Sequence, residues 1–356
     1  MGAHPRAAAE SACKRPRSGQ DAGNSRAAGL SGRRIDQVRS AVQGRVAAAS
    51  VACIGECMIE LREMPDGRFS RGYGGDTLNT AVYLARLGVP VDYVTALGDD
   101  PWSDEMVAAW GAEGVGTGRV RRIPGRVPGL YVIQTDARGE RRFSYWRDSA
   151  PARDLFAAPG GEAALAGYGL LYVSGITLSL YGEAGRARLF AALDQARAEG
   201  RRVAFDTNYR PRGWPSRAEA QAAFRAAMDR ASIVLASAED LDLLFGEGGA
   251  AEVLARRASA ELVLKLARPA CRVLAPGLDA EVPAEPVAEV VDTTAAGDSF
   301  AAAYLAARLA GHDPRAAARA GHHLAGAVIR HPGAIIPRDA MPAGLAAPRA
   351  TEGARA

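Results

Sequence analysis

The sequence predicts an α/β fold in which helices cover both faces of a mostly parallel β-sheet. The first observation is a series of short apolar segments bounded by Gly, Asp or Pro, which is the pattern of buried strands. The second is that amphipathic segments of helical length separate many of these strands, an alternation typical of parallel sheets. The third is a length of 356 residues, which is enough to bury the core of a large α/β domain.

The individual elements can be placed from residue 51 onward. The expected strands are 51–55, 91–97, 170–174, 202–206, 232–236, 261–266 and 271–275. The expected helices are 77–88, 101–114, 183–199, 216–230, 249–259, 297–310 and 314–330. Asp100 followed by Pro101 is typical of an N-cap and a first helical residue, so this pair marks the start of the second helix.

Two segments, 57–73 and 126–147, interrupt this alternation. Both contain strand-like runs that no helix follows. In the second segment the turn-prone residues 136–139 separate two such runs, which is the pattern of a β-hairpin. These segments predict a small β flap over the main sheet.

The two ends of the chain differ in composition from its middle. Residues 1–48 are rich in Arg, Ala, Gly and Ser without apolar periodicity, so we expect a disordered leader there, a folded domain over 49–345, and a disordered tail over 346–356. An Arg-rich start can resemble a transit peptide, but a misassigned start or a disordered extension is the simpler interpretation. Residues 1–46 hold nine Lys or Arg against three Asp or Glu, a net charge of +6, which leaves about −2 of the total +4 for the remainder. A slightly acidic body does not favour a nucleic-acid partner.

Other features of the composition favour a cytoplasmic, water-soluble protein. No segment approaches the roughly 18 consecutive apolar residues of a membrane helix, so no membrane partner is expected. The four cysteines, Cys13, Cys53, Cys57 and Cys271, lack the spacing of a disulfide framework or of a paired metal site. We expect Cys53 and Cys57 to pack in the core. The five histidines show no metal-ligand spacing either.

A turn of small residues, Ala295-Ala296-Gly297, leads directly into a helical pattern at Asp298. A helix N-terminus offers unpaired N–H groups and the positive end of a dipole, which suit a transferring phosphoryl group. Asp298 would then accept the proton of an attacking hydroxyl. The alternative is that Asp298 only caps the helix.

A second turn, Gly74-Gly75, enters the helix that carries Asp76 and Asn79. The glycines allow close approach of the backbone to a ligand, and the two polar side chains can bind hydroxyl groups. Capping alone would also explain Asp76. If both helices start at the carboxyl edge of the sheet, the two turns line one cleft, because ligands of open α/β folds bind at that edge.

The two turns, in this order, resemble the signature segments of the ribokinase-type (PfkB) carbohydrate kinases. Other segments resemble the members of that family that act on sugar acids: Pro128-Gly129-Leu130-Tyr131, Tyr145-Trp146-Arg147, Phe205-Asp206-Thr207-Asn208-Tyr209-Arg210-Pro211-Arg212 and Gly333-Ala334-Ile335-Ile336-Pro337-Arg338. The resemblance covers about residues 51–341. It implies a ribokinase-like three-layer α/β/α sandwich with a small β flap that acts as a lid.

The resemblance also implies roles for individual residues. The implied catalytic group is Asp298, with the backbone N–H groups of Ala295, Ala296 and Gly297. The implied substrate-binding residues are Gly74, Gly75, Asp76, Asn79, Tyr131, Tyr145, Arg147 and Arg210. The implied nucleotide-binding residues are Asn208, Tyr209, Arg210, Lys265, Ala295 and Gly297. Arg147 would hold a carboxylate through paired, charge-assisted hydrogen bonds.

The reaction implied by this resemblance is the ATP-dependent phosphorylation of 2-keto-3-deoxygluconate at its terminal hydroxyl, giving 2-keto-3-deoxy-6-phosphogluconate, with Mg²⁺ on the nucleotide. Two alternatives remain. One is a kinase of neutral sugars, of the fructokinase or ribokinase type. The other is a catalytically weakened sugar-acid-binding protein with a regulatory role. A homodimer is also expected, because exposed flap edges often pair between subunits.

Two departures from the family pattern sustain the second alternative, the regulatory protein. The usual Lys-x-Gly segment before the catalytic turn is Lys265-Leu266-Ala267 here, so the glycine is replaced. The segment Asn-x-x-Glu, which is linked to the metal, appears as Ser237-Ala238-Glu239-Asp240. No side chain is therefore assigned as a magnesium ligand.

Overall fold

The computed structural model describes residues 50–135, 141–157, 159–256 and 260–345. Its largest sheet has eight strands in the order β14-β13-β12-β11-β10-β9-β1-β4. The strands are β1 (Val51–Ile54), β4 (Val91–Val94), β9 (Leu170–Ser174), β10 (Arg202–Asp206), β11 (Ile233–Ser237), β12 (Glu261–Lys265), β13 (Ala270–Ala275) and β14 (Leu278–Pro283). The six strands from β4 to β12 are parallel, and β13 and β14 are antiparallel additions at one edge. The predicted mostly parallel sheet is confirmed.

The strands of this sheet send alternate side chains to two separate cores. In β1, Val51 and Cys53 join one core, whereas Ala52 and Ile54 join the other. This follows from the two-residue period of a strand, and it explains why these strands are apolar without alternation. Cys53 and Cys57 are buried in the first core, as expected.

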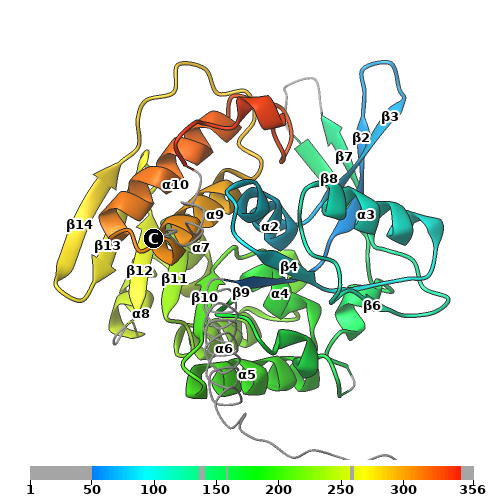
Figure 1. Cartoon of the computed structure of the whole chain (residues 1–356), viewed down its shortest axis with the longest axis horizontal. Coiled ribbons are helices and arrows are strands. Elements are labelled where there is room, and N and C mark those ends of the chain that lie inside the picture. Colours follow the sequence, from blue (N-terminus) through cyan, green and yellow to red (C-terminus); the bar gives the residue numbers. More distant parts are fainter. Residues whose placement is uncertain (1–49, 136–140, 158, 257–259, 346–356) are drawn as a thin grey trace, which may run out of the picture. The chain divides into compact units, whose positions relative to one another are not determined.

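Helices cover both faces of the sheet and produce three layers (Figure 1). The first face carries α2 (Asp76–Arg86), α3 (Pro101–Ala112), α9 (Ala296–Leu309) and α10 (Pro314–Val328). The second carries α4 (Gly175–Leu180), α5 (Glu183–Ala198), α6 (Arg217–Met228), α7 (Ala238–Phe245) and α8 (Ala250–Arg256). Short 3₁₀ helices lie at η1 (Pro151–Asp154), η2 (Glu162–Leu165), η3 (Pro211–Gly213) and η4 (Arg338–Ala340).

Local signals explain where several helices begin. Asp100 accepts hydrogen bonds from the backbone N–H groups of Trp102 and Ser103 at 3.0 and 3.2 Å, with Pro101 as the first helical residue. The predicted N-cap is therefore confirmed. The sequence did not predict α4, α7 or β14. The two helices follow their strands without a loop, so no turn residues separate them, and β14 alternates between the core and solvent rather than forming an apolar run.

The two segments that interrupt the alternation contain a second sheet, which we call the flap. Its strands are β2 (Met58–Glu63), β3 (Phe69–Gly74), β7 (Leu130–Thr135) and β8 (Arg141–Trp146), in the order β3-β2-β7-β8. The chain passes from β1 of the main sheet into β2 of the flap through Gly55, Glu56 and Cys57, so these residues lie where the two sheets meet. The expected strand 91–97 divides into β4 and β5 (Ala96–Leu97), and β5 pairs with β6 (Arg121–Arg122).

Some expectations concern residues outside the described ranges: the leader over 1–48, the tail over 346–356, the flap turn at 136–139 and the end of the helix expected over 249–259. Among the helices of the described ranges, none has the length and apolar character needed to cross a lipid bilayer.

Candidate active site

A cleft of about 1080 Å³ opens where the carboxyl ends of the parallel strands meet the flap. The first turns of α2 and α9 lie on its walls, as both predicted turns required. The predicted site residues that line it are Gly74, Gly75, Asp76, Asn79, Tyr131, Tyr145, Arg147, Asn208, Arg210, Lys265, Ala295, Ala296, Gly297 and Asp298. One cleft therefore collects side chains from segments that are more than 200 positions apart in the sequence.

The turn before α9 leaves the helix N-terminus open toward this cleft. Ala295 is the N-cap and has a left-handed backbone with φ of 59°, and no side chain caps the helix. Asp298 is the third residue of α9, so the alternative in which it serves as the N-cap does not hold. An uncapped N-terminus retains its attraction for an anion.

Asp298 is held on the cleft wall by residues of α2. Asn79 Nδ2 donates to Asp298 Oδ2 at 2.8 Å, and Thr80 Oγ1 donates to the Asp298 carbonyl oxygen at 3.3 Å. Burial raises the pKa of Asp298 to about 8, and the carboxylates of Asp76 and Asp206 add to this rise. Asn79 and Lys265 lower the same pKa, because they favour the ionised form. The carboxyl of Asp298 is therefore a weaker acid than an ordinary aspartic acid side chain.

The turn before α2 depends on its two glycines. A Cβ on Gly75 would lie 2.3 Å from the carbonyl oxygen of Glu56, and a Cβ on Gly74 would lie 1.9 Å from the Tyr131 hydroxyl. Neither distance is compatible with a larger residue. The helix start can thus lie against both the end of β1 and the flap, and Asp76 enters the cleft.

Two polar groups of this wall differ in their pairing. Asp76 Oδ2 accepts a hydrogen bond from Asn208 Nδ2 at 2.7 Å. Asn208 has a φ of 26°, a positive value that asparagine tolerates better than most residues. By contrast, Asn79 Oδ1 is buried without a partner among the described residues. A buried acceptor of this kind can receive a ligand hydroxyl.

The flap contributes an arginine and two tyrosines. Arg147 Nη2 donates to Glu56 Oε2, and their side chains are 20% and 1% exposed. Tyr131 is nearly buried and donates to Glu60, whereas Tyr145 stays exposed with its ring 5.9 Å from that of Tyr131. Burial raises the pKa of Tyr131, so it remains a neutral donor.

The opposite end of the cleft carries Lys265. Its Nζ lies 3.5 Å from Asp206 Oδ2, and a Cβ on Gly297 would lie 3.4 Å from the same Nζ. Lys265 is the last residue of β12 and is paired there with Ser237 of β11 and Cys271 of β13. The segment in which Ala267 replaces the family's glycine begins after this strand. The pairing of β12 with its two neighbours therefore positions the backbone of Lys265 without that segment.

Arg210 and Tyr209 follow β10 and face different ways. Arg210 Nη1 lies 3.6 Å from Asp240 Oδ1, whose carboxylate also accepts from Thr207 Oγ1 at 3.0 Å. Tyr209 is 4% exposed and packs edge-on against Phe224 with ring centroids 5.6 Å apart. Its side chain belongs to the core and does not line the cleft, so the nucleotide contact expected of Tyr209 remains a prediction for its backbone.

Several charged residues of the cleft were not predicted, among them Glu56, Arg153 and Asp206. Glu56 and Asp206 are buried carboxylates at the ends of β1 and β10. Burial raises the pKa of both groups, against the opposing effect of Arg147 on Glu56 and of Lys265 on Asp206. A charged residue where an apolar strand ends is the signal that would have identified these two.

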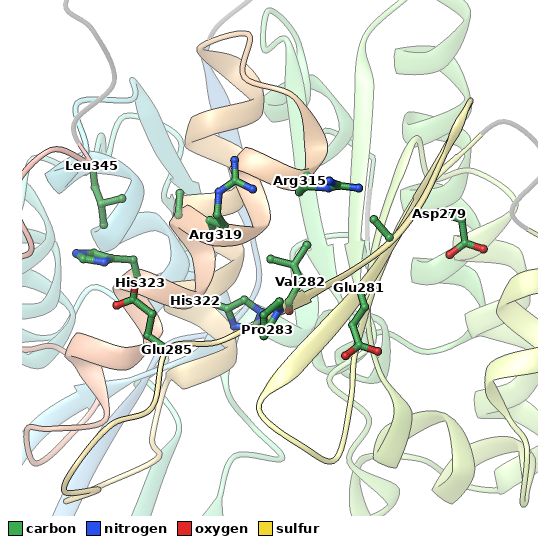
Figure 2. Close-up of a pocket in the computed structure, with 12 residues that line it drawn as sticks. Asp279, Glu281, Val282, Pro283, Glu285, Arg315, Arg319, His322, His323 and Leu345 are labelled. Atoms are coloured by element: carbon green, nitrogen blue, oxygen red, sulfur yellow. The ribbon is translucent and has the colours of Figure 1, made fainter.

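A second cavity, of about 720 Å³, lies between β14 and α10 and shares no lining residue with the cleft. Figure 2 shows Arg315 and Arg319 on α10 beside it, with Glu281 and Val282 on β14. Acidic and basic groups are mixed there and its rim is exposed, so it lacks the convergent polar groups of the cleft. Within the described ranges, no three His, Cys, Asp or Glu side chains form a group suited to a metal ion.

Comparison with known proteins agrees with this geometry. Residues 48–341 match the pfkB family of carbohydrate kinases. The 2-dehydro-3-deoxygluconokinase of Dickeya dadantii (strain 3937) is 47% identical over 307 residues, covering 83% of this chain and 99% of that protein. The 2-dehydro-3-deoxygluconokinase of Escherichia coli (strain K12) is 45% identical over 306 residues, covering 82% and 99%. The crystal structure of a fructokinase with bound ATP from Xylella fastidiosa superposes with a TM-score of 0.72 at 25% identity, covering 83% of this chain and 95% of that one. The ribokinase-like fold expected from the sequence is thereby confirmed, and the chain belongs to the pfkB family of carbohydrate kinases.

Proposed function

We propose that this chain transfers the γ-phosphoryl group of ATP to the terminal hydroxyl of 2-dehydro-3-deoxygluconate, the compound called 2-keto-3-deoxygluconate above. The observation that carries the proposal is that Arg147 of the flap and Asp298 of α9 line the same cleft. Arg147 would supply a cation for the carboxylate of the substrate, and Asp298 would supply a base for its terminal hydroxyl. The two relatives named 2-dehydro-3-deoxygluconokinase support the same substrate and agree with the expectation from the sequence.

The substrate would lie between the flap and α2. Arg147 would receive the carboxylate through its free N–H groups, because Glu56 is bonded only to Nη2. Asp76 and the unpaired Asn79 Oδ1 would accept hydrogen bonds from hydroxyl groups, and the Tyr131 and Tyr145 rings would cover the sugar chain. Gly74 and Gly75 leave the room that close approach requires.

Asp298 would act as the general base. Its carboxylate takes the proton of the terminal hydroxyl as the oxygen attacks the γ-phosphorus, and the bond to the ADP oxygen breaks. The pKa of about 8 in the empty cleft means that Asp298 must lose its proton before or during this step. Positive charge near Asp298 favours that loss, and Lys265 already lowers its pKa.

The open start of α9 would hold the transferred group. The backbone N–H of Gly297 and the dipole of the helix face the position of the phosphoryl oxygens, and Lys265 Nζ is adjacent to Gly297. Asn208 and Arg210 would lie along the nucleotide phosphates, since both line the cleft. Tyr209 would contribute only through the backbone.

Magnesium fits the residues of this end of the cleft. Mg²⁺ at a nucleotide site keeps several waters and takes one or two carboxylates together with phosphate oxygens. Asp206 and Asp240 are the carboxylates that would hold it, and Asp240 keeps the acidic group of the family's Asn-x-x-Glu segment. When bound, the ion neutralises negative charge on the triphosphate.

The neutral-sugar alternative is disfavoured mainly by the two relatives named 2-dehydro-3-deoxygluconokinase, and less by Arg147. Arg147 does not by itself exclude a neutral sugar, because Glu56 already gives its guanidinium an anionic partner. The regulatory alternative is disfavoured by the hydrogen bond between Asn79 and Asp298 and by the placement of Lys265 beside Gly297. The homodimer remains a prediction, supported by exposed apolar side chains on the flap such as Phe69 and Trp146.

A coupled assay of ADP release tests the proposal. The purified protein is supplied with ATP and Mg²⁺, and with 2-dehydro-3-deoxygluconate, its galactonate epimer, fructose, ribose or no sugar. We expect turnover with the deoxy keto acid. Turnover on fructose or ribose alone would refute the substrate assignment, and binding of the acid without any turnover would establish the regulatory alternative.

A further inference from the structure

The ion pair of Glu56 and Arg147 connects the main sheet to the flap. Glu56 follows β1, and Arg147 follows β8. A single hydrogen bond, from Arg147 Nη2 to Glu56 Oε2, joins them. The other carboxylate oxygen, Oε1, and the guanidinium Nε are buried without a hydrogen-bond partner among the described residues. Glu56 and Arg147 thus each keep one hydrogen-bonding atom that is unpaired among the described residues and shielded from solvent.

Several charged and titratable groups face Glu56. Arg153 of η1 lowers the pKa of Glu56, and Asp76 at the start of α2 raises it. In turn, the charge of Glu56 raises the pKa values of Tyr181, which follows α4, and of the adjacent Cys57 thiol. Burial is the largest influence and raises the pKa of Glu56 above its usual value. Burial thus opposes the ionised carboxylate, and Arg147 is the largest influence that favours it.

A sugar acid changes this balance. In the proposed function its carboxylate binds the guanidinium that already serves Glu56, so two carboxylates contact Arg147, and Arg153 is the other cation in the field of Glu56. Two carboxylates at such a site cannot both stay ionised without a large cost, and one of them gains a proton. Glu56 is the one that is 1% exposed, whereas the ligand lies in the open cleft.

We propose that Glu56 is a positioning residue that holds Arg147 by Nη2 in the empty cleft and takes up one proton when the sugar-acid carboxylate binds. The proton comes from the buffer and forms an O–H bond on the Glu56 carboxyl, and no other covalent bond changes. The inference rests on the proposed function, because it requires the ligand carboxylate to meet Arg147.

Two consequences follow for affinity. Between the pKa of Glu56 in the empty cleft and its higher pKa in the complex, the dissociation constant rises with pH, by at most about tenfold per pH unit. Glu56→Gln resembles the protonated form, keeps an acceptor for Arg147 and does not titrate. It should bind the acid with a dissociation constant that is nearly independent of pH. Glu56→Ala removes the acceptor and should bind about tenfold more weakly than Glu56→Gln.

Titration calorimetry without nucleotide tests the proposal. Binding of 2-dehydro-3-deoxygluconate is measured from about pH 6 to pH 9 in buffers of different ionisation enthalpy, which reports the number of protons taken up. The wild type should take up a proton and Glu56→Gln should not. Asp298 also titrates in this range, so Asp298→Asn is included, and it should take up the same proton as the wild type.

The outcomes separate the inference from the function on which it rests. A wild type that binds the acid without proton uptake, or Glu56→Gln with the wild-type pH dependence, overturns the role of Glu56 and leaves the proposed function intact. A wild type that does not bind the acid overturns both. Infrared difference spectra provide a measurement that does not depend on the folding of a variant: the wild type should gain the band of a protonated carboxyl on binding, and its absence would contradict the proposal.

Discussion

Asn79 Nδ2 lies 2.8 Å from Asp298 Oδ2, and this hydrogen bond joins the first turns of α2 and α9 across a sequence separation of 219 residues. It places a hydroxyl-binding wall and a candidate base in fixed relation to one another. The same amide presents its unpaired Oδ1 as a buried acceptor. A single side chain can thus orient the base and receive the ligand.

Asp298→Asn is expected to lower kcat by roughly 10²- to 10⁴-fold, the range for loss of a general acid or base. The variant keeps an oxygen for the Asn79 amide, so binding of the sugar acid should change little. Steady-state ADP release measures the first effect, and calorimetry measures the second. A variant with wild-type turnover would remove Asp298 from the proposed role.

In Glu56→Gln, where residue 56 does not titrate, the pH profile of kcat/KM should rise with pH through about 8, because the pKa of Asp298 is raised to about 8 and the base acts in its ionised form. Asn79 lowers this pKa by donating to the carboxylate. Asn79→Ala should therefore displace the acidic limb of the profile to higher pH, in addition to weakening sugar binding. A limb that stays in place would show that a different group controls the profile.

Arg147→Ala is expected to weaken binding of the sugar acid by about 10- to 150-fold, which corresponds to the roughly 1.5–3 kcal/mol of a charged hydrogen bond. Part of the loss would reflect Glu56, which is left buried without its cation. The double variant Glu56→Gln with Arg147→Ala isolates that part. Arg142→Ala is a matched control, since Arg142 is exposed on β8, the strand that Arg147 follows, and does not line the cleft. An unchanged KM in Arg147→Ala would exclude this residue from acid recognition.

Gly297→Ala should keep the fold and impair phosphoryl transfer. The added Cβ would meet only Lys265 Nζ, at 3.4 Å, so the thermal unfolding midpoint should stay within a few degrees of the wild type. The methyl group would displace the transferred phosphoryl group and lower kcat by about 10²-fold. Gly326→Ala in α10 is the control, because its Cβ would contact only Val287 Cγ2 at 3.5 Å. Equal activities of the two variants would contradict the proposed phosphoryl position.

The sequence predicted those parts of the site that depend on local chemistry. The turns at Gly74 and Ala295 are visible as small residues ahead of a helical pattern, and both enter one cleft because parallel strands end at one edge of the sheet. The apolar strands were predictable for the same local reason. The edge strand β14 was not, since one of its faces is solvent-exposed and its pattern is that of a surface segment.

The features that sequence reasoning missed are those that arise from contacts between distant residues. Arg147 and Glu56 are 91 positions apart, so neither the pair nor its burial can be deduced from either segment. Tyr209 lies between two cleft residues, and only the packing of Phe224 shows that its ring faces inward. The position of Lys265 also depends on distant residues, because its strand pairs with Ser237 and Cys271, and the segment that ends at Ala267 does not show this.

The division of the cleft between two sheets bears on how such an enzyme can diversify. The candidate acid-recognising groups Tyr131, Tyr145 and Arg147 belong to the flap, whereas Asp298 and Lys265 belong to the main sheet and its helices. On the proposed assignment, recognition of the acid group and phosphoryl transfer reside in two different sheets. Exchange of flap residues, together with Glu56 beneath them, can therefore redirect the enzyme toward another sugar while its phosphoryl-transfer groups stay unaltered.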